Sequence, residues 1–286
     1  MPTIARRLAS LLRPKTDPSP IVNKPPNTNA CPHHRMARIL YAVMLTLLIT
    51  IAIPIVVLRV LTSSFMEDNR MQGFVFDTTE SDGEPSMKFV MAALPRMLYQ
   101  VPTKLALVAA VLSIFLYGAH LGFVGTDWKS GKRTQTYAFR RNIMLLHITN
   151  ALVILFALVS IYVAHKSASH FRDGYVNFRA SVMNDISPEQ TYFRYSVGRF
   201  DLETWACELK DVKGAAMVQD DYSKQCHIEV AGRDIMIPFM ILSWLVAGVS
   251  VWGFVGGGRR SPDGERVKTQ DVGLELGKMR VSSSSN

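Results

Sequence analysis

Charged residues are absent from four long stretches of this 286-residue chain, residues 39–58, 105–126, 142–165 and 235–258. Each stretch reaches the roughly 20 residues that a helix needs to cross the hydrocarbon core of a bilayer. Buried helices of soluble proteins are usually shorter and keep a polar stripe, so this pattern argues against a soluble protein. Backbone groups in lipid must be hydrogen-bonded within their own segment, which favours helices. The sequence therefore predicts an all-α fold, an integral membrane four-helix bundle.

Sequence motifs of common enzyme classes are absent as well. The chain contains no GxSxG, HExxH, P-loop or Rossmann GxGxxG motif, and the four stretches carry no carboxylate. These motifs supply a nucleophile, metal ligands or a phosphate-binding loop, so their absence argues against those enzyme classes. We therefore predict a protein with no catalytic site and no cofactor. N-glycosylation is not expected either, because the chain has no Asn-x-Ser/Thr sequon.

Positive charge is concentrated in three of the five segments outside the predicted spans. Lys and Arg outnumber acids by seven to one in residues 1–38, by five to one in 127–141 and by six to four in 259–286. Acids are in excess in residues 59–104 and 166–234. Because Lys and Arg beside spans are retained on the cytoplasmic side, both termini and the short connection are predicted to be cytoplasmic. The other two segments are predicted to be exoplasmic loops, and the polar C-terminal tail to be disordered.

The basic segments also bear on partners and location. Their position beside helix ends predicts contact with anionic lipid headgroups, which accounts for the net charge of +9 without a nucleic-acid partner. A plasma or secretory-pathway membrane is the predicted location. Residues 4–13 leave a mitochondrial membrane open, because their Arg residues and helical Leu face suit a presequence as well as a helix on headgroups.

Cysteine is scarce, with three residues in the whole chain. Cys207 and Cys226 fall in the predicted second exoplasmic loop, an oxidising environment, and Cys31 precedes the first span on the reducing side. We predict a disulfide that holds a small loop domain between the third and fourth spans; two free thiols are the alternative. No metal-ligand spacing surrounds the pair, so no metal site is predicted. Cys31 is a candidate for palmitoylation, and an inert thiol is equally compatible with its position.

Local patterns in the second loop predict a folded domain. Asp201 precedes LETWACEL and is expected to cap a short helix, on which Leu202 and Trp205 share a side. The loop is also the predicted binding surface for protein partners. Its candidate contact residues are aromatic, and some of them must form the small core instead. They are Tyr192, Phe193, Tyr195, Phe200 and Trp205.

Small residues inside the spans suggest where helices approach closely. Gly118 and Gly122 lie four apart in the second span, and Gly253 and Gly257 lie four apart in the fourth. Such spacing lets helix backbones come close, so these spans are expected to pack together near their cytoplasmic ends. The last glycines are equally consistent with a simple helix end.

Three polar side chains lie within the predicted spans. His120 is in the second span, and His147 and Asn150 are in the third. Counting from the cytoplasmic ends at about 1.5 Å per residue places all three roughly 8–12 Å deep, so they are expected to meet. Interhelical hydrogen bonds are one interpretation, and a polar path through an oligomer is the other.

The layout of four spans, cytoplasmic ends and a larger second loop with a disulfide resembles the tetraspan families. The order of loop sizes is similar to that of tetraspanins, although their Cys-Cys-Gly motif is missing. The stretch GRFDLETWACEL, followed by a second cysteine before the last span, is similar to uncharacterised four-pass proteins of filamentous fungi. This resemblance implies no activity. The hypothesis is a non-catalytic membrane organiser that binds partners through its second loop, and the alternative is a subunit of a small homo-oligomeric channel or transporter.

Overall fold

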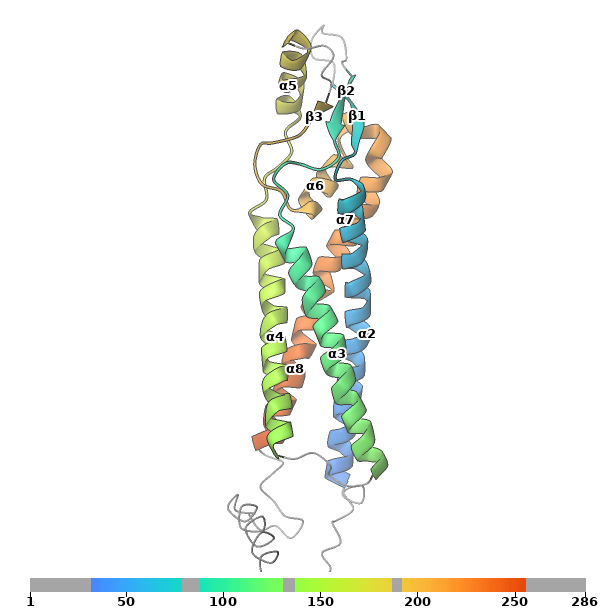
Figure 1. Cartoon of the computed structure of the whole chain (residues 1–286), viewed down its shortest axis with the longest axis vertical. Coiled ribbons are helices and arrows are strands. Elements are labelled where there is room, and N and C mark those ends of the chain that lie inside the picture. Colours follow the sequence, from blue (N-terminus) through green and yellow to red (C-terminus); the bar gives the residue numbers. More distant parts are fainter. Residues whose placement is uncertain (1–31, 79–87, 131–136, 187–191, 256–286) are drawn as a thin grey trace, which may run out of the picture.

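The computed structural model describes residues 32–78, 88–130, 137–186 and 192–255. Four long helices lie side by side and form a bundle (Figure 1). They are α2 (Pro32–Asp68), α3 (Val101–Ser130), α4 (Tyr137–Lys166) and α8 (Met236–Val255). Each is long and apolar enough to cross a membrane. The prediction of a four-helix, multi-pass integral membrane protein is therefore confirmed.

The outer surface of the bundle is apolar. Only 22% to 33% of the most apolar 18-residue window in each span is buried within the chain. Large side chains such as Val43, Phe115 and Phe156 point outward and are at least half exposed. So much apolar area is unfavourable in water and suits hydrocarbon, which explains why the apolar residues surround each helix instead of forming one stripe.

The helices pack around a ring in which α2 and α4 each contact both α3 and α8. This order leaves α3 and α8 diagonal to one another. Buried alanines provide the close contacts, with Ala106, Ala109 and Ala110 on one face of α3 and Ala157 on α4. Small side chains of this kind let helix backbones approach in a membrane.

The predicted packing of the second and fourth spans through glycines is wrong at Gly118 and Gly122. A Cβ added at either position would meet no described atom within 4 Å, so neither glycine lies in a close helix contact. The physical reason is the ring order, because α3 packs on α2 and α4 and faces α8 only across the diagonal. Gly253 lies in α8, and Gly257 falls outside the described residues.

A small folded unit, which we call the head domain, covers one end of the bundle (Figure 1). It comprises the described residues of 69–100 and 167–234. Its strands are β1 (Gly73–Asp77), β2 (Lys88–Ala92) and β3 (Tyr192–Phe193), and its helices are α5 (Asp173–Ile186), α6 (Leu202–Leu209), η1 (Lys213–Val218) and α7 (Gln219–Asp234).

The sheet of the head domain joins the two interhelical loops. Strands β1 and β2 pair antiparallel, with Val75 opposite Val90, and β3 pairs parallel to β2, with Phe193 opposite Met91. A two-stranded hairpin is marginally stable alone, so the short strands need the third strand and the helices packed on them. The domain predicted from residues 166–234 alone therefore also includes strands from the first loop.

The predicted helix cap in the second loop is confirmed. Asp201 caps α6, and its Oδ1 accepts a hydrogen bond from the Thr204 backbone N–H at 3.3 Å. Helix α7 continues into α8 through Ile235, which keeps helical dihedral angles and donates to the Ala231 carbonyl at 3.0 Å.

The aromatic residues of the head domain form its core. Phe193, Tyr195, Phe200 and Trp205 are each at most 5% exposed, so their proposed role as a contact face is wrong. They pack with rings from the first loop because a domain this small needs large side chains to exclude water. Tyr192 lies in β3, and its side chain is outside the described part.

Candidate functional site

The predicted disulfide is present. Cys207 near the end of α6 is bonded to Cys226 in α7, and their Cα atoms are 4.8 Å apart. The bond fixes α6 against the helix that becomes the fourth span. It thereby holds one wall of a pocket on the head domain.

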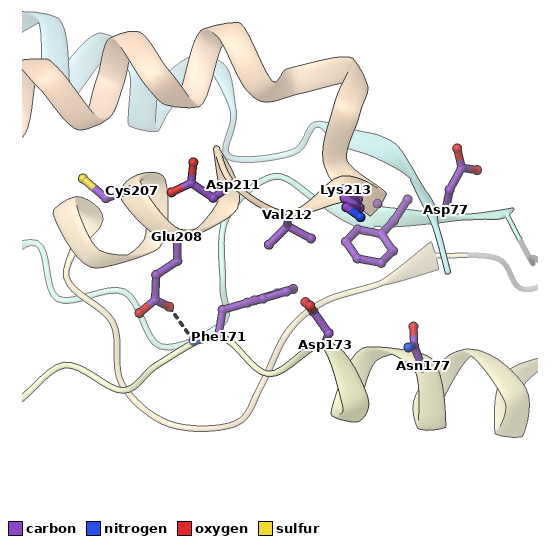
Figure 2. A pocket seen from close by; sticks show the side chains of 11 residues that line it. Asp77, Phe171, Asp173, Asn177, Cys207, Glu208, Asp211, Val212 and Lys213 are labelled. Atoms are coloured by element: carbon purple, nitrogen blue, oxygen red, sulfur yellow. Dashed lines mark hydrogen bonds between the residues drawn. The ribbon is translucent and has the colours of Figure 1, made fainter. Parts of the chain in front are cut away.

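The pocket has a volume of about 470 Å³ and lies where α5, α6, η1 and β1 meet (Figure 2). Its lining residues come from three separate segments of the chain. They are Phe76, Asp77, Phe171, Asp173, Asn177, Cys207, Glu208, Asp211, Val212, Lys213 and Gly214. A pocket of this size can admit one amino-acid side chain or a small ligand.

Aromatic rings form the base of the pocket. The centroids of Phe76 and Phe171 are 6.4 Å apart, and Phe171 stacks on Tyr195 at 5.2 Å and meets Trp205 edge-on at 5.7 Å. These contacts connect the base to the buried core. The base of the pocket therefore rests on packed side chains.

Gly214 permits the close approach of η1 to β1 on one side of the pocket. A Cβ at this position would overlap the Asp77 carbonyl oxygen and would lie 2.6 Å from the Phe76 ring. Both approaches are far closer than van der Waals contact, so any larger residue would push the wall away from the strand. This glycine was not singled out from the sequence, because its requirement arises from a contact with a distant strand.

Carboxylates dominate the charge of the pocket. Among the described residues, Asp77, Asp173, Glu208 and Asp211 line it together with one cation, Lys213. Glu208 is held in place, because it accepts hydrogen bonds at 2.5 Å from His170 Nδ1 and from the Phe171 backbone N–H, the latter drawn in Figure 2. Burial raises the pKa of the Asp173 carboxyl above its ordinary value.

Rings and carboxylates in one cavity suit a cationic group. The face of an aromatic ring attracts an ammonium or guanidinium ion, and carboxylates accept its hydrogen bonds. A nearby cation would also stabilise the ionised form of Asp173, which burial disfavours. The arrangement can therefore bind a lysine or arginine side chain.

A second polar region lies inside the bundle. His120 on α3 and His147 on α4 are joined by a hydrogen bond of 2.8 Å between Nδ1 and Nε2. Asn150 does not reach a histidine; its Nδ2 donates to Ser113 Oγ and Tyr117 Oη, both at 2.9 Å. Tyr117 stacks on the His147 ring with centroids 5.5 Å apart and so connects the two groups.

The intramembrane network has members that the sequence analysis missed. Ser113 and Tyr117 precede His120 by seven and three residues on the same face of α3, and Ser243 of α8 hydrogen-bonds Tyr117 at 2.9 Å. Helical spacing from His120 could have identified the first two. The hydrogen bonds of Tyr117, His147 and Ser243 join α3, α4 and α8, and His147 Nδ1 is left without a partner among the described residues.

A buried ion pair connects the first span to the head domain. Arg59 Nη1 lies 2.8 Å from Glu229 Oε2, and the two side chains are 2% and 7% exposed. Thr62 donates to the other Glu229 oxygen, and so does Gln225 at 3.0 Å. The Arg59 guanidinium would lie 3.2 Å from a Cβ at Gly232, a tight contact that would require a shift of a few tenths of an ångström. From the sequence, both residues are expected in the exoplasmic loops, and their burial is not predicted.

Comparisons with protein-family models, with curated proteins and with solved structures find no match to this chain. The resemblance to fungal four-pass proteins therefore stays a prediction. Cys31, the candidate for lipidation, lies outside the described residues. The function has to be argued from the site itself.

Proposed function

We propose that this chain is a non-catalytic tetraspan membrane organiser whose head domain binds protein partners on the exoplasmic side. The observation that carries the proposal is the pocket, which is lined by carboxylates and rings, rests on packed side chains, and lies on a domain to which both loops contribute. A partner segment with an exposed lysine or arginine has the chemistry to enter it.

The orientation is supported by the arrangement of the chain ends. Helix α2 begins, α3 ends, α4 begins and α8 ends at the end of the bundle opposite the head domain (Figure 1). The three basic segments of the sequence are attached to these helix ends. Retention of Lys and Arg on the cytoplasmic side then directs the head domain outward, where oxidising conditions favour its disulfide.

Labelling with a membrane-impermeant maleimide tests this orientation. In intact cells, Cys207 and Cys226 should react only after reduction, with the more exposed Cys207 reacting first, and Cys31 only after permeabilisation. An Ala216→Cys variant supplies an exposed thiol on the head domain and should react without reductant. Labelling of Cys31 from outside, with the Ala216→Cys thiol protected, would show that the chain is inserted the other way.

Partner binding is tested by removing charge from the pocket. Replacing both Asp173 and Asp211 with asparagine should reduce crosslinks formed by partner proteins through Lys213 about tenfold, the effect of losing roughly 1.4 kcal/mol of binding free energy. The readout is quantitative mass spectrometry of crosslinked peptides from intact cells. Lys213 lines the pocket, so its crosslinks report the site directly.

A matched variant removes the same charge elsewhere. Asp220→Asn with Asp221→Asn neutralises two exposed acids in the first turn of α7, outside the pocket lining, and should leave Lys213 crosslinks unchanged. Equal loss in both variants would mean that net charge alone matters. Unchanged crosslinks in both variants would show that the partner does not bind in the pocket.

The intramembrane network supports an organiser, because its hydrogen bonds are used to hold three helices together. The channel or transporter hypothesis stays an untested alternative. It would require these side chains to face a path shared between several copies of the chain.

A further inference from the structure

Three side chains with metal-binding atoms converge where the head domain meets α4. His165 belongs to the last turn of α4, Asp201 precedes α6, and Glu203 lies in the first turn of α6. One atom from each lies within 4.8 Å of the other two. His165 Nδ1 is 3.2 Å from Asp201 Oδ2 and 3.8 Å from Glu203 Oε2.

These separations match the spacing of ligands around one ion. Nitrogen and oxygen ligands lie about 2.1 Å from Zn²⁺, so two corners of a tetrahedral site are roughly 3.4 Å apart. The distances from His165 fall on either side of this value. The Asp201 and Glu203 oxygens also lie within 4.8 Å of one another, so one ion can reach all three atoms after small side-chain adjustments.

The outer oxygen of each carboxylate is held by a second group. Asp201 Oδ1 accepts from the Thr204 backbone N–H at 3.3 Å, and Glu203 Oε1 accepts from Arg233 Nη1 at 2.6 Å. The inner oxygens are the ones that face His165. Orientation of ligands by a second layer of hydrogen bonds is typical of metal sites and is not required of a simple surface ion pair.

Charge and access also suit a cation. Arg233 offsets one of the two carboxylate charges, which leaves one negative charge when the imidazole is neutral. The side chains of Asp201 and Glu203 are 12% and 8% exposed, and that of His165 is 36% exposed, so an ion can enter past the histidine. An imidazole with two carboxylates favours a divalent transition metal over Ca²⁺ or Mg²⁺, which prefer shells of oxygen.

We propose that His165, Asp201 and Glu203 form a Zn²⁺ site that ties the end of the third span to the head domain. A water molecule, or Thr204 Oγ1 at 3.4 Å from His165 Nδ1, would occupy the fourth position. Binding requires His165 Nδ1 to be unprotonated, so the ion replaces the proton that this atom would donate to Asp201. The site is independent of the pocket and of its proposed partner.

Zinc titration of the purified full-length chain tests the site. The protein is kept in detergent micelles with an affinity tag that contains no histidine, and Cys31, His33 and His34 are replaced with alanine in every variant to remove other zinc ligands. Competition with a chromophoric chelator should show one Zn²⁺ bound per chain. His165→Ala should weaken binding at least tenfold, because losing even a group that only hydrogen-bonds a metal ligand costs roughly 10- to 100-fold in affinity.

Two further variants separate metal binding from folding. Asp201→Asn keeps the helix cap, because asparagine caps as well as aspartate, and should still weaken zinc binding at least tenfold. His170→Ala removes an exposed histidine that pairs with Glu208 and should bind zinc as the wild type does. The proposal is overturned if the wild type binds no zinc, or if His165→Ala binds it as tightly as His170→Ala does.

Discussion

Replacing Glu229 with alanine is expected to lower the free energy of unfolding by about 3–5 kcal/mol, because it leaves the Arg59 charge buried without a counter-ion. Arg59 Nε and Nη2 have no hydrogen-bond partner among the described residues, so Glu229 is the group that compensates the guanidinium there. Thr62 and Gln225 would lose their acceptor as well. Chemical denaturation in detergent micelles, followed by circular dichroism, measures the change.

Two comparisons show whether burial causes this loss. Glu67 pairs with Arg70 at 3.9 Å on the surface, and Glu67→Ala should change stability by less than about 1 kcal/mol. The double variant Arg59→Met with Glu229→Leu replaces the ion pair with apolar groups and should recover the wild-type stability or exceed it. If Glu229→Ala costs no more than Glu67→Ala, the ion pair does not hold the first span to the head domain.

The ion pair also illustrates what the sequence could not predict. Arg59 and Glu229 are 170 residues apart. Arg59 follows the first uncharged stretch, and Glu229 precedes the fourth. A charge at such a position is equally compatible with contact to lipid headgroups or to solvent. Their burial depends on α2 and α7 extending beyond the membrane and packing together. Local sequence patterns predict a helix and its cap well, as at Asp201. They carry no information about which distant element that helix packs against.

The same distinction applies to the head domain and its pocket. The disulfide was predictable, because the chain has three cysteines and the charge pattern places two of them, Cys207 and Cys226, in the same predicted exoplasmic loop. The sheet was not, because the strands of the first loop are five residues long and pair with two residues of the second. The pocket follows from that pairing, since Phe76 and Asp77 of β1 reach residues of α5, α6 and η1 only once both loops fold together.

Trp205→Ala is expected to destabilise the head domain by about 3–5 kcal/mol. The indole is fully buried and contacts Phe200 and Tyr195 with centroids 5.1 Å and 5.5 Å apart. Its Nε1 donates to the Ala93 carbonyl at 2.9 Å, so it also joins the second loop to the first. Faster amide hydrogen exchange in β2 and α6, with unchanged exchange in α3 and α4, would locate the loss in the head domain.

Two controls divide this effect between packing and hydrogen bonding. Trp205→Phe keeps an aromatic ring in the core and loses only the N–H, and the Ala93 carbonyl still accepts from the Tyr222 hydroxyl, so a loss of about 1–2 kcal/mol is expected. Phe178→Ala removes an aromatic ring that is 62% exposed on α5 and should change stability by no more than about 0.5 kcal/mol. Equal losses for Trp205→Ala and Phe178→Ala would mean that the aromatic core does not hold the two loops together. The pocket would then lack the rigid base on which its binding of a cationic side chain depends.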